Sequence, residues 1–295
     1  MRQPLAVTSV AEIADDYDAF IVDQWGVLHD GVTPYPFAIP TLKVLATLRK
    51  RVIFVTNTAK SGEDNAIIVQ EMGIDHSLFE RVISAGDDAR QAIYKSPDPF
   101  YKSLGRRCFP LSRPTDRRLA EGPGFEVVNH IDAADWLFLL SSEPPEYALE
   151  TWKPVLHEAI KRDLPMVCGN PDFYRVCPDG RVVEAPGQIA RFYESIGGRV
   201  RIHGKPQKSI YESALAHFDF SPDRILAVGD SIPHDIAGAA TCEIDSLLIA
   251  SGVHRNDLII GNNLVTDPTE VAKICEPFGV SPKYITRQFD WVVKP

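Results

Sequence analysis

The sequence lacks the features of membrane proteins and of secreted, disulfide-bonded proteins. Its five cysteines are an odd number without a CxxC pair, which fits neither a disulfide framework nor a zinc site and favours a reducing compartment. The N-terminal segment has no apolar core of about 7 to 15 residues, and no apolar run approaches the roughly 18 residues of a membrane helix. We therefore expect a cytoplasmic protein with no membrane partner.

Positive charge is scarce as well. The 31 lysines and arginines are outnumbered by 40 aspartates and glutamates, which gives a formal net charge of -9. Nucleic-acid polymers are bound largely through Lys and Arg side chains that neutralise phosphates and release counterions. A polymeric DNA or RNA partner is therefore not expected.

Apolar runs of strand length, by contrast, recur along the chain. They are FIVDQ (20–24), VIFVTN (52–57), WLFLLS (136–141), ILAVGD (225–230) and SLLIAS (246–251). Between them apolar residues repeat at helical spacing, as at Leu42, Leu45 and Leu48, and Ser61 can cap a helix that stops at Gly73. This alternation predicts an α/β fold with a mostly parallel sheet that helices cover on both faces.

The segment from about Ala89 to Ile202 has a different character. Turn-rich stretches such as KSPDPF and AEGPGFE interrupt its short strands. A chain of 295 residues with 44% hydrophobic content is long enough to form two domains. We predict a core domain formed by residues 1–88 and 203–295, and a second α/β domain, residues 89–202, inserted into it.

Reactive side chains follow three of the predicted strands. Asp23, Thr56 with Asn57, and Asp230 each lie where a strand ends. Ligands of parallel sheets bind beyond the carboxyl ends of the strands, so these side chains should converge on one pocket. Each residue taken singly has an ordinary alternative, since an aspartate after a strand often caps a turn and a threonine often caps a helix.

Two further segments complete a set suited to phosphoryl transfer. HGKPQKS places Lys205 before a helix, and VGDSIPHD supplies Asp235 after Asp230. Phosphoryl transfer needs an in-line nucleophile, donors to the phosphate oxygens and charge neutralisation. Asp23 and Asp230 can hold Mg²⁺, which prefers oxygen ligands, with Asp235 orienting this shell. A solvated lysine and two charges at a helix N-terminus are the ordinary alternatives.

This ordered set resembles the four motifs of the haloacid-dehalogenase superfamily, and its details are similar to the class IIA, or NagD-like, phosphatases. The resemblance covers nearly the whole chain and includes GNPD (169–172), GKP (204–206) and SLLIASGVH (246–254). It implies a Rossmann-like core with an α/β cap inserted between the second and third motifs. It also implies magnesium-dependent hydrolysis of a small phosphate ester through an aspartyl-phosphate. Caps of this type can dimerise in the family, so a homodimer through the cap is compatible with it.

The resemblance also implies a role for each matched residue. These roles are nucleophile for Asp23, phosphate binding for Thr56 and Asn57, charge stabilisation and phosphate binding for Lys205, and metal binding for Asp23 and Asp230. In the family the cap closes over the core and selects the leaving group. Asn170 and Asp172 are the candidates for substrate contact from the cap, and an ordinary NPD turn is the alternative interpretation.

Trp25 departs from the family pattern. The phosphatases of this superfamily carry Asp-x-Asp, and the second aspartate ligates magnesium through its backbone carbonyl and exchanges the proton of the leaving group. Trp25 can supply the carbonyl but not the proton, and a missing acid or base typically costs about 10² to 10⁴ in rate. His29, Asp30 and His234 are candidate substitutes. The indole itself could stack on a ring, exclude water or simply pack in the interior.

Three functions remain open at this point. The first is a magnesium-dependent phosphatase for a small phosphorylated metabolite, of the sugar phosphate or nucleotide class. The second, suggested by Trp25, is a catalytically weakened protein that binds or senses a phosphorylated metabolite. The third is a dehalogenase or phosphonatase, because these branches also lack the second aspartate; dehalogenases, however, need no magnesium pocket.

Overall fold

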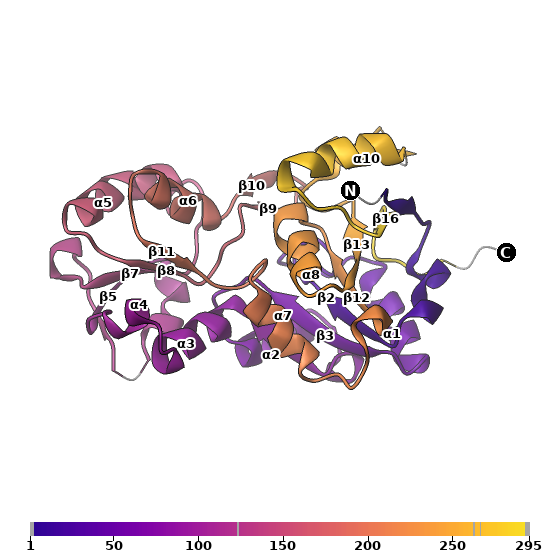
Figure 1. Ribbon diagram of the computed structural model, residues 1–295, viewed down its shortest axis with the longest axis horizontal. Coiled ribbons are helices and arrows are strands. Elements are labelled where there is room, and N and C mark those ends of the chain that lie inside the picture. Colours follow the sequence, from indigo (N-terminus) through magenta and orange to yellow (C-terminus); the bar gives the residue numbers. More distant parts are fainter. Residues whose placement is uncertain (1–2, 123, 262, 266, 293–295) are drawn as a thin grey trace.

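The computed structural model describes residues 3–122, 124–261, 263–265 and 267–292. Its main feature is a parallel sheet of seven strands in the order β1-β16-β13-β12-β2-β3-β4. These strands are β1 (Leu5–Ala6), β2 (Ala19–Val22), β3 (Arg51–Thr56), β4 (Arg81–Ser84), β12 (Ile225–Gly229), β13 (Asp245–Ile249) and β16 (Tyr284–Thr286). Strands from both ends of the chain therefore form one sheet, as the indigo and orange ribbons of Figure 1 show.

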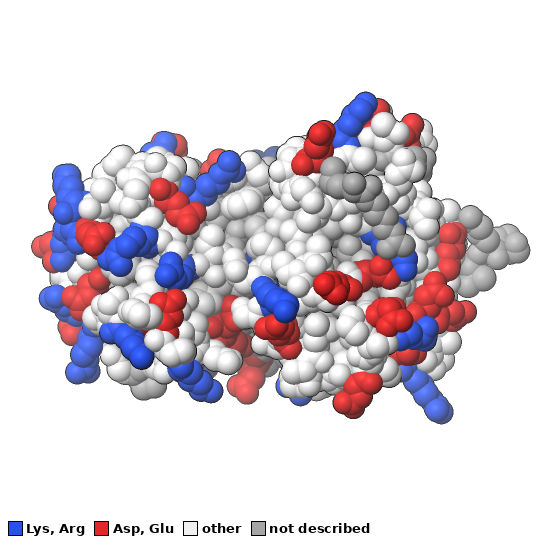
Figure 2. Space-filling view, in the orientation of Figure 1, with Lys and Arg blue, Asp and Glu red and all other residues white. Residues whose placement is uncertain are grey.

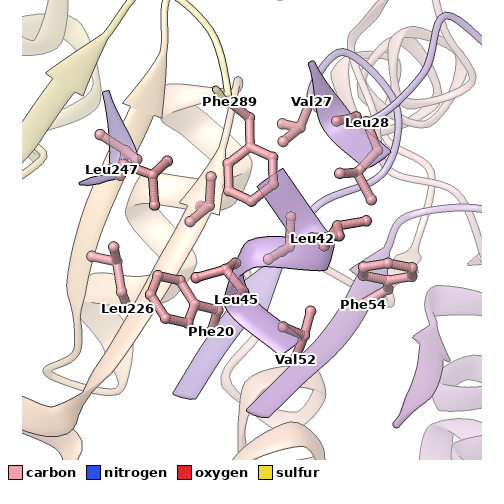
Figure 3. Close-up of a cluster of buried hydrophobic side chains, with 14 of the residues drawn as sticks. Phe20, Val27, Leu28, Leu42, Leu45, Val52, Phe54, Leu226, Leu247 and Phe289 are labelled. Atoms are coloured by element: carbon pink, nitrogen blue, oxygen red, sulfur yellow. The ribbon is translucent and has the colours of Figure 1, made fainter. Parts of the chain in front are cut away.

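The central strands are buried on both faces because helices cover both. Along β2, Phe20 and Val22 pack into one core cluster, while Ala19 and Ile21 pack into another. The first cluster includes α1 (Ala38–Thr47) and α2 (Gly62–Glu71), and the second includes α7 (Lys208–Leu215) and α8 (Ala237–Thr241). Figure 3 shows Phe20, Phe54 and Leu226 directed toward α1. The predicted doubly covered parallel sheet is thus confirmed.

The structure agrees with the predicted helix start at Ser61 and helix end at Gly73, but not with the predicted helical face at Leu42, Leu45 and Leu48. The Ser61 hydroxyl accepts a hydrogen bond from the Asp64 amide at 3.1 Å, and α2 stops just before Gly73, whose φ of 95° is left-handed. The exception is Leu48, which lies after the end of α1 and is 44% exposed. Each three-residue step falls short of a full helical turn of 3.6 residues. Two such steps from Leu42 therefore carry position 48 away from the face that Leu42 shares with Leu45.

A second parallel sheet, of five strands in the order β11-β8-β7-β5-β6, lies beside the first (Figure 1). Its strands are β5 (Arg107–Leu111), β6 (Glu126–Val127), β7 (Trp136–Leu139), β8 (Met166–Cys168) and β11 (Val200–Ile202), and it packs against α5 (Leu149–Lys161) and α6 (Gly187–Ser195). We call this unit the cap. The domain boundaries at 88/89 and 202/203 stay a prediction, and the first of them falls inside α3 (Ala85–Lys95).

An antiparallel hairpin, β9 (Tyr174–Val176) and β10 (Val182–Glu184), extends from the cap toward the core. On the face drawn in Figure 2, charged side chains of both signs gather over the two units, and uncharged residues cover most of the region between them. Within the described ranges, every helix is too short or too polar to cross a bilayer. A homodimer through the cap stays a prediction.

Candidate active site

The site lies where three neighbouring parallel strands end. Asp23 directly follows β2, Thr56 is the last residue of β3, and Asp230 directly follows β12. These strands are adjacent in the order β12-β2-β3, and all three side chains line one cavity of about 130 Å³ between core and cap. The structure therefore brings the strand-end residues together, as the parallel arrangement predicts.

Lys205 connects two of the carboxylates in this site. Its Nζ donates to Asp23 Oδ1 at 2.5 Å, to Asp235 Oδ1 at 2.8 Å and to the Val55 carbonyl oxygen at 3.3 Å. These three acceptors match the three N–H groups of an ammonium. Burial tends to lower the pKa of Lys205, but Asp23 and Asp235 outweigh it and hold that pKa well above its usual value. The lysine is therefore a fixed positive charge beside Asp23.

Three buried carboxylates form the acidic part of the site. Oxygen atoms of Asp23, Asp230 and Asp235 all lie within 4.8 Å of one another. Burial raises the pKa of Asp23 to about 8 against the opposing effect of Lys205, and burial together with the neighbouring carboxylates raises the pKa of Asp230. One lysine thus faces three carboxylates, and an additional cation would balance this cluster. An all-oxygen set with excess negative charge fits Mg²⁺.

Glycines give Asp230 room at the strand end. Gly26, with φ of 86°, lies so close that an added Cβ would fall 2.0 Å from Asp230 Oδ2, and at Gly252 the same atom would be 2.1 Å away. The Val253 amide donates to Asp230 Oδ2 at 2.9 Å. Side chains at either glycine would therefore displace the carboxylate, which explains why the turn after Trp25 needs glycine.

Asn57 joins the core to the cap through its side chain. Its Oδ1 accepts a hydrogen bond from the Lys205 amide at 2.7 Å, and its Nδ2 donates to Asp172 Oδ1 at 2.8 Å. The side chain is buried. Because its amide is already engaged, a role of Asn57 in phosphate binding falls to its backbone, beside the hydroxyl of Thr56.

The cap contributes residues that sequence patterns did not single out. Asn170 and Asp172 line the cavity, and their contact with substrate stays a prediction; Arg113, Glu143 and Arg175 line the cavity as well. Glu143 accepts from Arg113 Nη1 at 3.0 Å and from Arg175 Nη2 at 2.8 Å. These residues are spread over separate loops and strands of the cap without a common motif. No local signal could have linked them before the cap was folded.

Trp25 connects the core to the β9–β10 hairpin. Its Nε1 donates to the Val176 carbonyl oxygen at 2.6 Å, and the Arg175 guanidinium lies 5.4 Å from the centre of its ring. The ring also lines the cavity and packs against Gly31. The structure therefore places the indole at the cavity wall as a contact between cap and core, a role that the sequence did not suggest, and the partly exposed ring is not packed in the interior.

The three candidate substitutes for the missing acid have side chains that are engaged outside the cavity lining. His29 is buried, its Nδ1 accepts from the Gly31 amide at 3.0 Å, and burial lowers its pKa to about 4. Asp30 accepts from the amides of Val32 and Thr33 in an exposed turn. His234 accepts from the Phe173 amide at 3.3 Å. In the described part of the chain, none of the three lines the cavity.

Replacing Trp25 with phenylalanine should loosen the hairpin while preserving a ring. The variant loses the hydrogen bond to Val176, which is worth about 1 kcal/mol. We expect faster amide hydrogen exchange in residues 174–184 than in the wild type. Trp152→Phe is the matched control, because within the described residues the Trp152 indole N–H has no partner to lose. Equal exchange in both variants would contradict a connecting role for Trp25.

Comparisons with known proteins agree with this architecture. The haloacid dehalogenase-like hydrolase family matches residues 20–126, and a HAD-hydrolase-like family matches residues 202–274. A glycerol-3-phosphate phosphatase of Rattus norvegicus is 25% identical over 81% of this chain and 80% of its own. A 4-nitrophenylphosphatase of Schizosaccharomyces pombe is 23% identical over 90% and 95%.

A solved structure gives the same picture. A haloacid dehalogenase-like hydrolase from Brucella suis superposes with a TM-score of 0.79 at 27% identity, over 96% of this chain and 99% of the other. The likeness extends across both the core and the inserted cap. The chain belongs to the haloacid dehalogenase-like hydrolases, in their class IIA, NagD-like branch.

Proposed function

We propose that this hydrolase is a magnesium-dependent phosphatase that cleaves small phosphate esters through an aspartyl-phosphate on Asp23. The observation that carries the proposal is the buried Asp23–Lys205–Asp235 arrangement beside Asp230 at adjacent strand ends. Relatives named for phosphatase activity on glycerol 3-phosphate and 4-nitrophenyl phosphate support the same reaction class.

The geometry supports a task for each residue. Lys205 holds one oxygen of Asp23 at 2.5 Å and orients the carboxylate for in-line attack on phosphorus. Thr56 offers its hydroxyl to a phosphate oxygen from the next strand. Asp23, Asp230 and the Trp25 carbonyl would hold Mg²⁺, with Asp235 supporting the site through Lys205; when bound, the ion would neutralise charge on the phosphoryl oxygens.

The cap limits the size and chemistry of the substrate. With the hairpin against the core, the cavity holds about 130 Å³, so a phosphorylated metabolite with a small leaving group fits best. Arg113 and Arg175 line the cap side of this cavity and can meet polar or anionic groups of that leaving group. We therefore place the substrate among small phosphorylated metabolites of the sugar phosphate type.

A panel of phosphate esters tests the proposal. We expect phosphate release from glycerol phosphates, sugar phosphates, nucleotides or 4-nitrophenyl phosphate in the presence of Mg²⁺, and little or none with EDTA. Binding of phosphate without turnover of any ester would favour the second candidate, a binding protein, which the missing carboxylate at Trp25 suggests. Haloacids and phosphonates in the same panel test the third candidate.

Magnesium should also stabilise the fold, which gives a readout that is independent of activity. A ligand that binds only the folded state at about 100 times its Kd contributes about 2.7 kcal/mol. We expect Mg²⁺ to raise the thermal midpoint of the wild type and to have little effect on Asp230→Asn. Asp223→Asn is the matched control, since this exposed residue precedes the opposite end of β12. If Mg²⁺ raised the thermal midpoint equally in all three proteins, this result would count against the proposed metal site.

A further inference from the structure

The proposed reaction needs a group that protonates the leaving oxygen, and Trp25 cannot do so. The carboxyl side chains that line the cavity are Asp23, Asp116, Glu143, Asp172, Asp230 and Asp235. Three of these form the buried cluster around Lys205. Asp116 and Glu143 are paired with Arg113 at 2.6 and 3.0 Å. Asp172 is the carboxyl group that neither the cluster nor an arginine engages in the described structure.

Asp172 is held at the cavity from both domains. Its Oδ1 accepts a hydrogen bond from Asn57 Nδ2 at 2.8 Å and lies 4.0 Å from His234 Nε2. Its backbone oxygen accepts from the Gly187 amide at 2.7 Å, which fixes the GNPD turn on α6. Within the described residues its Oδ2 has no hydrogen-bond partner. One oxygen therefore anchors the side chain, and the other is available for a substrate.

Asp172 and Asp23 line the same cavity and are connected through Asn57 and Lys205. The same Asn57 side chain that donates to Asp172 accepts from the Lys205 amide, and Lys205 holds Asp23. The charge of Asp172 contributes to the raised pKa of Asp23. Asp172 comes from the cap, and the proposed function places the leaving group on the cap side of the cavity.

We propose that Asp172 exchanges the proton that the family's second aspartate would otherwise exchange, and this inference rests on the proposed phosphatase function. As Asp23 forms its bond to phosphorus, the bond from phosphorus to the leaving oxygen breaks and that oxygen takes the proton of Asp172. The resulting carboxylate then removes a proton from the water whose oxygen attacks the aspartyl-phosphate. Inorganic phosphate leaves, Asp23 is free again, and Asp172 is again protonated.

The dependence on the leaving group tests this role. Glycerol 3-phosphate releases a basic alkoxide that needs a proton, whereas 4-nitrophenyl phosphate releases a weakly basic phenolate. We expect Asp172→Asn to lower kcat for glycerol 3-phosphate by about 10² to 10⁴. With 4-nitrophenyl phosphate the first step should survive, so that a burst of about one nitrophenol per site precedes slow turnover.

Companion variants separate proton exchange from folding. Asp172→Glu keeps a carboxyl group and should retain more activity than Asp172→Asn. Adding Trp25→Asp to Asp172→Asn returns a carboxyl to the family's usual position and should recover at least about tenfold in kcat. Asp179→Asn is the matched control, because this exposed aspartate lies in the turn of the β9–β10 hairpin that follows Asp172, and it should behave as the wild type.

Two results would overturn the role of Asp172. One is an Asp172→Asn variant whose kcat for glycerol 3-phosphate falls by less than about tenfold. The other is an equal loss with both esters, without a burst and without recovery by Trp25→Asp, which would indicate a structural contact only. A wild type that cleaves neither ester would instead contradict the proposed phosphatase function itself.

Discussion

Asp23→Asn should abolish phosphate release from every ester that the wild type hydrolyses. The amide cannot act as the nucleophile, and loss of a covalent nucleophile typically costs about 10⁴-fold or more in turnover. The fold should persist, because Lys205 keeps its 2.8 Å contact with Asp235. Phosphate release from the purified variant, measured over hours against the wild type, checks the loss of turnover.

Binding measurements separate the loss of the nucleophile from a loss of phosphate binding. Asp23→Asn should still bind inorganic phosphate, because the Thr56 hydroxyl is unchanged and the positive charge of Lys205 stays beside the site, and calorimetry can compare its affinity with that of the wild type. Asp23→Ala provides a second variant in which the side-chain oxygen is missing altogether. If both variants retained more than about a hundredth of the wild-type turnover, water or another residue would have to attack the phosphorus directly.

The sequence could predict the core of the site because parallel sheets impose it. A run such as ILAVGD marks a buried strand, and the residue after it must emerge at the same edge as the residues after neighbouring strands. Asp23, Thr56 and Asp230 came together for this reason. The helix signals at Ser61 and Gly73 were equally local, and they too matched the structure.

The position of Asp235 could not be predicted in the same way. The suggestion from the sequence that Asp235 orients the metal shell stays a prediction, and the structure adds a direct contact with Lys205. Asp235 lies in a π-helical turn, η8 (Ile232–Ile236), and its side chain packs against Gly229. A Cβ added at Gly229 would fall 2.0 Å from the Asp235 Cγ. Periodicity assumes regular helices, so it gives no sign of such a turn.

Contacts between the domains were beyond sequence reasoning for a different reason. Trp25 meets Val176, and Asn57 meets Asp172, across more than one hundred residues of chain. Such contacts depend on how the cap sits on the core, and neither hydrophobic spacing nor turn residues encode that placement. For Trp25 the sequence could show what the residue cannot do chemically, whereas its connecting role required the structure.

Lys205→Met should destabilise the core by about 3–5 kcal/mol and remove turnover. Methionine keeps most of the side-chain volume, so the effect comes from charge: Asp23 and Asp235 lose their buried counter-ion, and uncompensated buried charge is costly. Urea unfolding followed by tryptophan fluorescence measures the change in the free energy of unfolding. Lys208→Met is the matched control, because this exposed lysine, three residues after Lys205, forms an ion pair with Glu212 at the surface. The urea midpoint of this variant should stay near that of the wild type.

Two changes that offset the missing positive charge would show that unpaired buried charge causes the loss of stability in Lys205→Met. Mg²⁺ should stabilise Lys205→Met more than it stabilises the wild type, because the ion would balance carboxylates that the lysine no longer neutralises. Adding Asp235→Asn to Lys205→Met should likewise restore part of the lost stability, since the double variant buries one negative charge fewer. If neither treatment recovered stability, the loss would have to come from packing, and Lys205 would not be acting as the counter-ion that orients Asp23 for attack.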